Sequence, residues 1–134
     1  MTEIGTELFR TTTAIDRARL VRYAGASGDF NEIHWNERFA TEVGLPGVIA
    51  HGMLTMGCAS AALEEWAGDP GRILSFGTRF SRPVPVPDPG AAELEIVGTL
   101  GAVDGETWQV NIAVTCAGQG VLARTRATVR AEVG

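Results

Sequence analysis

The spacing of apolar positions predicts a helical first half of the chain and a strand-rich second half. One short strand is expected over residues 7–14, followed by helices over residues 17–24, 37–43 and 50–67. Polar and small residues at the helix ends support these limits, because side-chain oxygens cap free backbone N–H groups and glycine adopts the left-handed turn that ends a helix. The residues in these positions are Asp16, Asn36 and Gly44.

The third helix is the longest, and its pattern differs from that of a surface helix. Between Met53 and Leu63 it is apolar or small on every side. A helix without a polar face is typically buried. We therefore expect other parts of the protein to surround it.

The second half of the chain alternates between apolar and polar residues, which predicts strands. The alternating segments are residues 74–80, 94–100, 108–116 and 121–131. Asp104-Gly105 predicts a hairpin turn between the second and third of them. The connection PVPVPDPG, residues 83–90, is rigid and donates few backbone hydrogen bonds.

One buried helix with about five mostly antiparallel strands predicts a single α+β domain over residues 1–134. A curved antiparallel sheet wrapped around the long central helix would bury that helix on all sides. This arrangement is the hot dog architecture, in which two protomers usually pair their sheets edge to edge.

The composition and net charge restrict the kinds of partner that we expect the chain to bind. The net charge is −5, which argues against nucleic acid. No apolar run is long enough to cross a membrane. The N-terminus has no basic segment followed by an apolar one, so we expect a cytoplasmic protein without a secretory signal.

Several kinds of chemistry are also disfavoured. Cys58 and Cys116 have neither a disulfide framework nor zinc-site spacing, so we expect no metal site and no redox cofactor. The chain contains no lysine, which excludes Schiff-base catalysis by its own side chains.

The stretch SGDFNEIHWN, residues 27–36, contains the first candidate site. It places Asp29 five residues before His34, one of only two histidines, on irregular chain among apolar residues. Such a pair can transfer protons near neutral pH, and burial together with proximity would tune it. The alternative is structural: Asp29 turns the backbone, and His34 is a core histidine with its hydrogen bonds satisfied.

A second feature is the start of the long helix at His51-Gly52. Backbone N–H groups there are unpaired and could stabilise an oxyanion, and glycine would let a substrate approach closely. An acid/base pair with an oxyanion donor indicates proton abstraction beside a carbonyl. His51 could act as a second base, or it could only make structural hydrogen bonds.

The wider pattern resembles a known family. Tyr23, Ser27-Gly28-Asp29, Asn31 and Ile33-His34, with Ala40 and then AHGMLTMG (residues 50–57), are similar to the hydratase 2 motif and central-helix start of the MaoC-like family. The family contains (R)-specific enoyl-thioester hydratases and (3R)-hydroxyacyl-thioester dehydratases with the hot dog fold. The resemblance implies reversible hydration and dehydration of acyl-CoA or acyl-carrier-protein thioesters.

The resemblance also implies roles for single residues. Asp29 and His34 match the catalytic pair, and Gly52 matches the backbone donor to the thioester carbonyl. Asn31 matches a residue that orders the loop, and Ser60 matches a supporting position on the helix. The family usually has proline where this chain has Glu32, which puts the rigidity of the loop in doubt.

Four longer stretches resemble one branch of the family more specifically. They are YAGASGDFNEIHWNE, AHGMLTMG, WAGDPG and RFSRPVPVPDPG. They are similar to the catalytic subunit of the two-subunit (3R)-hydroxyacyl-ACP dehydratase of the mycolic-acid type of fatty acid synthase II. The resemblance implies either a homodimer or a heterodimer with a related hot dog subunit, and the sequence does not decide between them.

Two other functions compete with a hydro-lyase. A hot dog thioesterase would use a carboxylate for hydrolysis, but Glu64 and Glu65 lie late in the helix, away from Gly52. A non-catalytic acyl-binding subunit would have no need of both Asp29 and His34. Arginines on the last strand could meet carrier protein or CoA phosphates, or could simply be solvated; they are Arg124, Arg126 and Arg130.

Overall fold

The computed structural model describes residues 2–131. Its helices are α1 (Arg17–Ser27), α2 (Glu37–Glu42) and α3 (Gly52–Ala67), and two short 3₁₀ turns are η1 (Glu32–His34) and η2 (Pro70–Arg72). The strands are β1 (Glu7–Asp16), β2 (Ile73–Phe80), β3 (Ala91–Asp104), β4 (Thr107–Cys116), β5 (Gln119–Gly120) and β6 (Leu122–Arg130). All the longer predicted elements are present, while η1, η2 and β5 were not expected from the sequence.

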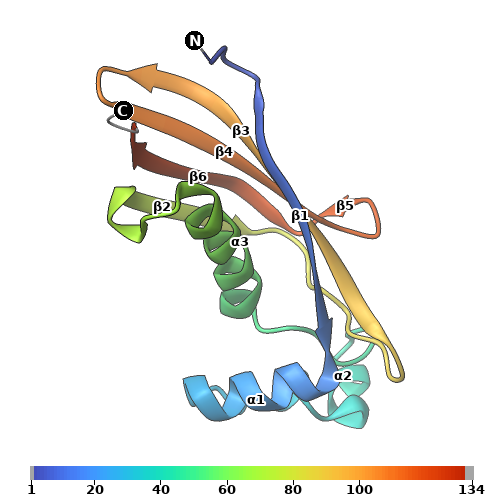
Figure 1. Cartoon of the computed structure of the whole chain (residues 1–134). Coiled ribbons are helices and arrows are strands. Elements are labelled where there is room, and N and C mark those ends of the chain that lie inside the picture. The colour runs from blue at the N-terminus through green and yellow to red at the C-terminus, as the bar shows by residue number, and fades with distance from the viewer. Residues whose placement is uncertain (1, 132–134) are drawn as a thin grey trace.

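The strands form one curved antiparallel sheet in the order β1-β3-β4-β6-β2, with β5 added beside β4. Figure 1 shows α3 along one face of this sheet and α1 and α2 together at its far end. The sheet is open, so β1 and β2 are edge strands. The architecture agrees with the predicted α+β class.

The caps of the first two helices form as predicted. The Asp16 carboxylate accepts a hydrogen bond from Arg19 N–H at 2.8 Å, and Asn36 accepts one from Phe39 N–H at 3.1 Å. Ile15 and Leu20 are both buried in the core, which matches the expected packing across the first turn of α1. These contacts fix the residue at which β1 ends and α1 begins. The helix α1 in turn leads into the candidate segment, residues 27–36.

The prediction that α3 is buried on every side is wrong for the chain as described. Met53 is 58% exposed, and Gly57 and Ala61 lie on the same exposed face. The reason is that the sheet covers one side of the helix only. The helix also begins at Gly52 rather than at residue 50.

Residues 48–50 instead form an extended stretch that joins the site to the proline-rich connection. Ile49 N–H donates to Ile33 O, and Ala50 N–H donates to Val84 O at 2.9 Å. Val86 N–H then donates back to Val48 O at 3.0 Å. Val86 thus supplies an N–H donor that the flanking prolines lack, Val84 supplies an acceptor, and both side chains are buried.

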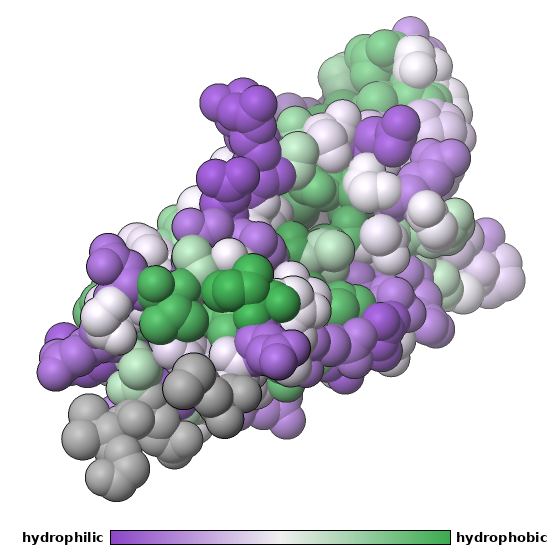
Figure 2. Space-filling view, turned by 90° about the horizontal axis from the view of Figure 1, so that it is seen from above, coloured by the Kyte–Doolittle hydropathy of each residue, from purple (hydrophilic) through white to green (hydrophobic). Residues whose placement is uncertain are grey.

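Apolar surface remains outside the core. Figure 2 shows green patches interrupting the hydrophilic surface on the face seen from above. The large apolar side chains that stay exposed include Ile4, Val21, Phe30, Met53, Leu74, Phe80 and Val103. Within residues 2–131, no helix is both long and apolar enough to cross a membrane.

Candidate active site

A series of side-chain turns shapes the segment that follows α1. The helix ends at Gly28, whose φ of 78° is the left-handed conformation that glycine tolerates best. Asp29 N–H then donates to Ser27 Oγ at 3.1 Å, and Asn31 N–H donates to Asp29 Oδ1 at 3.2 Å. Asn31 Oδ1 accepts from Ile33 N–H at 3.3 Å and so begins η1. Short polar side chains therefore order the loop where the family proline is missing.

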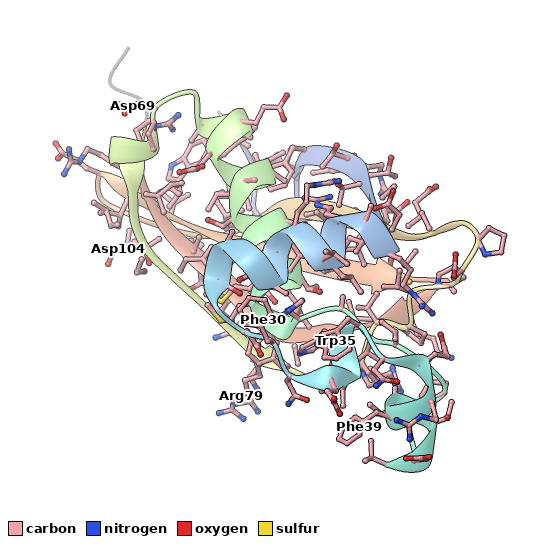
Figure 3. All side chains as sticks on the ribbon, turned by 90° about the horizontal axis from the view of Figure 1, so that it is seen from below. Phe30, Trp35, Phe39, Asp69, Arg79 and Asp104 are labelled. Atoms are coloured by element: carbon pink, nitrogen blue, oxygen red, sulfur yellow. The ribbon has the colours of Figure 1, made fainter. Side chains whose placement is uncertain are left out.

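The aromatic residues of this segment lie on its outer side. Trp35 Nε1–H donates to Phe30 O at 2.9 Å, which closes the loop around η1. Figure 3 shows both side chains on the underside of the molecule, close to α1. Both are substantially exposed, so they brace the loop without filling the core.

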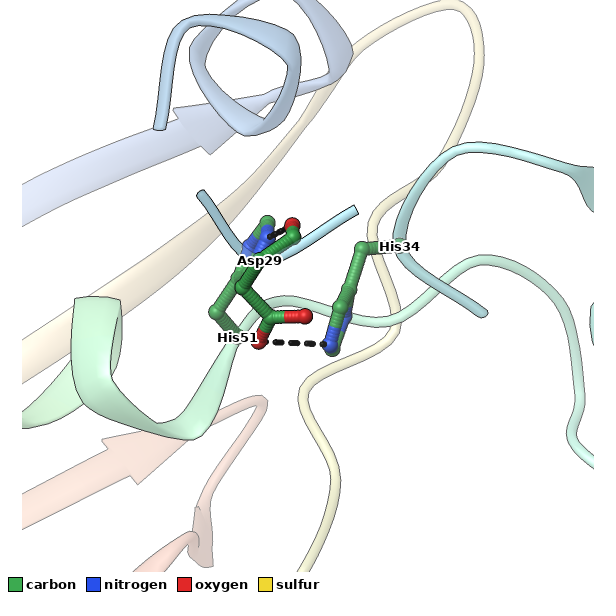
Figure 4. Close-up of side chains that lie close together, drawn as sticks. All are labelled: Asp29, His34 and His51. Atoms are coloured by element: carbon green, nitrogen blue, oxygen red, sulfur yellow. Dashed lines mark hydrogen bonds and ion pairs between the residues drawn. The ribbon is translucent and has the colours of Figure 1, made fainter. Parts of the chain in front are cut away.

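Asp29 and His34 face each other as the sequence predicts. Asp29 Oδ2 lies 3.8 Å from His34 Nε2, as the dashed line in Figure 4 marks. The other ring nitrogen, Nδ1, lies 2.8 Å from Ile49 O. Because a carbonyl oxygen only accepts, Nδ1 carries the proton in the neutral ring and Nε2 has a free lone pair. The basic nitrogen of His34 therefore points to Asp29.

The two interpretations of the pair prove compatible. Asp29 uses Oδ1 for the turn at Asn31 and leaves Oδ2 facing His34. His34 uses Nδ1 for the backbone of Ile49 and leaves Nε2 facing Asp29. In each side chain, one polar atom makes a hydrogen bond to the backbone, and this bond orients the second polar atom toward the other side chain.

The burial of the pair is uneven. The His34 side chain is 8% exposed, whereas that of Asp29 is 51% exposed. The expectation of a jointly buried pair is therefore wrong for this chain on its own. Asp29 sits on the loop with nothing among the described residues covering its outer side, and a partner protomer over this loop would change that.

His51 is the third ionisable side chain of the cluster. It is 1% exposed, and its ring stacks on that of His34 with centroids 3.8 Å apart and an interplanar angle of 20°. Its Nε2 lies 3.2 Å from Asp29 O, and its ring centroid lies 4.7 Å from that of Tyr23 in an edge-to-face arrangement. Burial lowers the pKa of His51, and neighbouring His34 acts in the same direction against the backbone contact and charge of Asp29.

The first turn of α3 opens into a cavity beside His34. Gly52 and Thr55 line it with His34, and the cavity volume is about 390 Å³. Among residues 2–131, no hydrogen bond engages Gly52 N–H. A free N–H at a helix start, close to a basic nitrogen, can stabilise negative charge on a carbonyl oxygen.

Phe80 contributes a contact at this cavity that the sequence analysis missed. A Cβ on residue 52 would approach the Phe80 ring to within 3.0 Å, so a side chain here would require the exposed ring to shift. Thr55 and Arg82 also line the cavity and were not singled out. Phe80 and Arg82 lie in the quoted RFSRPV stretch, but only the fold brings that stretch to the first turn of α3.

Ser60 is not brought to this cluster. It is half-buried on α3, eight residues beyond Gly52 and thus about 12 Å further along the helix axis. It does not line the cavity around His34. Its supporting role remains a prediction.

Asp29, His34 and His51 also offer three ligand atoms within 4.8 Å of one another. The geometry does not suit a metal ion well. The imidazole planes lie nearly parallel, so their in-plane lone pairs do not converge, and the Nε2 of His51 is engaged by Asp29 O. The arrangement fits proton transfer better than metal ligation.

Comparison with known proteins places this site in a family. A family model described as "MaoC like domain" matches residues 2–118. A solved structure titled "MaoC-like dehydratase" superimposes with a TM-score of 0.94 at 37% identity, covering 98% of this chain and 41% of that one. The chain belongs to the MaoC-like family, and its fold is the predicted hot dog fold.

Two curated relatives have reactions in their names. The 3-hydroxyacyl-thioester dehydratase X of Mycobacterium tuberculosis is 41% identical over 73 residues, which are 54% of this chain and 25% of that protein. The 3-hydroxybutyryl-CoA dehydratase of Methylorubrum extorquens is 31% identical over 103 residues, which are 76% of this chain and 63% of that protein. The chain thus spans less than two thirds of the length of either relative.

Proposed function

We propose that this protein is a hydro-lyase that interconverts (3R)-hydroxyacyl and trans-2-enoyl thioesters. The proposal rests mainly on one observation: Asp29 Oδ2 and His34 Nε2 lie 3.8 Å apart, beside a cavity lined by His34 and Gly52. Family membership and the dehydratase names of the relatives support the same reaction.

The proposed reaction starts at the thioester carbonyl. Gly52 N–H and the N-terminus of α3 would bind the carbonyl oxygen, which makes the proton on C2 more acidic as the enolate forms. One such donor contributes about 3–4 kcal/mol to the transition state. The exposed Met53 and the cavity lining leave this N–H reachable.

Proton transfer then belongs to the pair. In dehydration, His34 Nε2 takes the C2 proton, the C3–O bond breaks, and the double bond forms between C2 and C3. The ionised Asp29 carboxylate stabilises the imidazolium, and the proton that His34 took from C2 passes to the departing hydroxyl, directly or through Asp29 and a site water. The C2 proton balances the proton that leaves on water, and hydration reverses these steps with the same groups.

A thioesterase is a poorer fit to the geometry. Its carboxylate would have to reach the carbonyl bound at Gly52, but Glu64 and Glu65 lie twelve and thirteen residues along α3 and are exposed. That is about 18 Å along the helix axis. Asp29 is the carboxylate near the cavity, and it already faces His34.

The oligomer and the acyl carrier form the finer part of the proposal. The exposed face of α3, the free edge of β2 and the uncovered side of Asp29 all favour a second hot dog protomer. A homodimer and a heterodimer with a related subunit both satisfy these surfaces. The thioester carrier is CoA or acyl carrier protein, and the proposed cellular location is the cytoplasm.

Crotonyl-CoA distinguishes the hydro-lyase from the thioesterase. The purified chain is mixed with crotonyl-CoA, and the enoyl-thioester absorbance is followed while a thiol reagent reports free CoA in a parallel cuvette. We expect the absorbance to fall without thiol release. Thiol release at the rate of the absorbance change would contradict the proposal and support hydrolysis.

A further inference from the structure

The ring of His51 contacts both members of the candidate pair. It stacks on His34 with 3.8 Å between centroids, and its Nε2 reaches the backbone oxygen of Asp29 at 3.2 Å. It is more deeply buried than either partner. Figure 4 shows the His51 ring behind Asp29, with Nε2 directed at the Asp29 backbone oxygen.

The hydrogen bonds give the two imidazoles opposite tautomers. His34 donates from Nδ1 to Ile49 O, whereas His51 donates from Nε2 to Asp29 O. Neutral imidazole carries one N–H, so His51 Nδ1 is unprotonated. That nitrogen is buried without a hydrogen-bond partner, and as a bare acceptor it costs less than a protonated cation would in the same place.

The neutral state of His51 matters for the reaction. The ionisable groups that face its ring are Asp29, His34 and Tyr23. When His34 takes a proton, a charged His51 would place a second cation in stacked contact with it. A neutral ring adds no such repulsion and still fixes the plane in which His34 presents Nε2.

We infer that His51 is a positioning residue. As a neutral imidazole protonated on Nε2, it fixes the His34 ring by stacking and the Asp29 backbone by a hydrogen bond. This inference rests on the proposed function for its kinetic consequence. Its tautomeric consequence stands on the structure alone.

The first test is nitrogen NMR of the imidazole rings. The chain contains only two histidines, so two ring systems are expected, and a His34→Asn variant assigns them. At pH 7.5 we expect His34 to be protonated on Nδ1 and His51 on Nε2. A shared tautomer, or a His51 cation at this pH, would overturn the inference whether or not the protein shows activity.

The second test separates the two contacts by substitution. His51→Gln retains an amide donor for Asp29 O, His51→Phe retains a ring for His34, and His51→Ala retains neither. We expect His51→Ala to lower kcat by up to about 10²-fold with little change in KM, because misplacement of a catalytic group by about 1 Å has that effect. The kcat of His51→Gln and of His51→Phe should lie between those of wild type and His51→Ala. In the His51→Ala variant, the His34 ring should no longer populate a single tautomer.

The outcomes separate this inference from the proposed function. If wild type hydrates crotonyl-CoA and a folded His51→Ala variant keeps its kcat and the His34 tautomer, the positioning role is wrong while the function stands. If wild type and His34→Ala are equally inactive although NMR shows opposite tautomers, the function assigned to this chain alone fails and the positioning geometry stands.

Discussion

At the scale of single residues, the site depends on two side chains that each bind the backbone through one polar atom and face the other side chain through a second. Asp29 and His34 are both anchored by one polar atom and free at the other. A residue anchored in this way presents its free atom without losing much side-chain entropy on substrate binding. The anchoring partners, Asn31 N–H and Ile49 O, are backbone groups that side-chain substitutions retain, except that proline at position 31 would remove the N–H.

The sequence predicted this pair, and its structural alternative predicted a backbone turn at Asp29 and a hydrogen-bonded His34, but not the partner of His34. The five-residue spacing and the family motif identified Asp29, His34 and Gly52, because these are local features of the chain. The contact of His34 with Ile49 and that of Gly52 with Phe80 join segments 15 and 28 residues apart. Such contacts depend on the fold, and no local pattern encodes them.

The first prediction concerns the oxyanion position. Gly52→Ala should lower the turnover of crotonyl-CoA by about 10²–10³-fold, because the new methyl group lies beside the N–H and pushes on the Phe80 ring at 3.0 Å. Phe80 is exposed and can move, so the unfolding midpoint should change little. Gly25→Ala, in α1 and with open space around it, is the matched control and should retain activity.

A second prediction concerns the pH dependence of stability. Burial holds the pKa of His51 below its ordinary value of 6.5, so below that pH the unfolded chain binds a proton that the folded chain does not. The stability that neutral His51 provides is therefore present above pH 6.5 and is lost as the pH falls through the lowered pKa. Urea unfolding of wild type and His51→Gln should give free energies that differ most at pH 8 and converge toward pH 5. A constant difference across this range would contradict it.

At the scale of elements, Arg17 joins several of the segments that surround the active-site loop. Arg17 at the start of α1 donates to Val86 O at 2.7 Å and pairs with Glu37 of α2. Glu37 also accepts from Val48 N–H at 3.3 Å. These contacts join α1, α2, the stretch before α3 and the proline-rich connection, which are the four segments around the site.

A third prediction follows for this link. Arg17→Met should lower the free energy of unfolding by about 1–3 kcal/mol, because it leaves the oxygen of buried Val86 without its donor and removes the charge partner of Glu37. Arg38→Met removes the exposed pair with Glu42 on the same helix and should cost less than about 0.5 kcal/mol. Equal losses in urea unfolding would show that the Arg17 link has no special structural role.

Elements were predicted well because their signals are local. Alternation, caps and the Asp104-Gly105 turn placed the strands and helices, and β3 exceeds its expectation only because the apolar pattern is weaker at its ends. Burial of α3 within this chain was overestimated. An apolar composition indicates that a helix is covered, but it does not show whether the same chain or another molecule covers it. Here the sheet covers one face, and Met53 marks the other.

At the scale of the whole molecule, the uncovered surfaces lie on the same elements that carry the site. The exposed side of α3 begins with Met53, next to Gly52, and the edge strand β2 ends at Phe80 over the same glycine. A protomer placed there would cover apolar surface and border the cavity at once. We therefore expect assembly and activity to be linked.

The fourth prediction tests that link. Light scattering of the purified chain should give a mass above that of one chain, or should do so once a related subunit is supplied. Met53→Asp should shift the particle toward the single chain and reduce turnover together, whereas Val103→Asp, at an exposed apolar position on the β3–β4 hairpin, should change neither. A single-chain particle with full turnover would contradict it.

The central claim is that Asp29 and His34 together transfer the protons of a thioester hydro-lyase. The most direct measurement is the turnover of crotonyl-CoA by wild type, Asp29→Asn and His34→Ala, with Glu32→Gln from the same loop as control. We expect each of the first two variants to remain folded and to lose about 10²–10⁴-fold in kcat, while the control stays near wild type. Near-normal turnover in both Asp29→Asn and His34→Ala would contradict it.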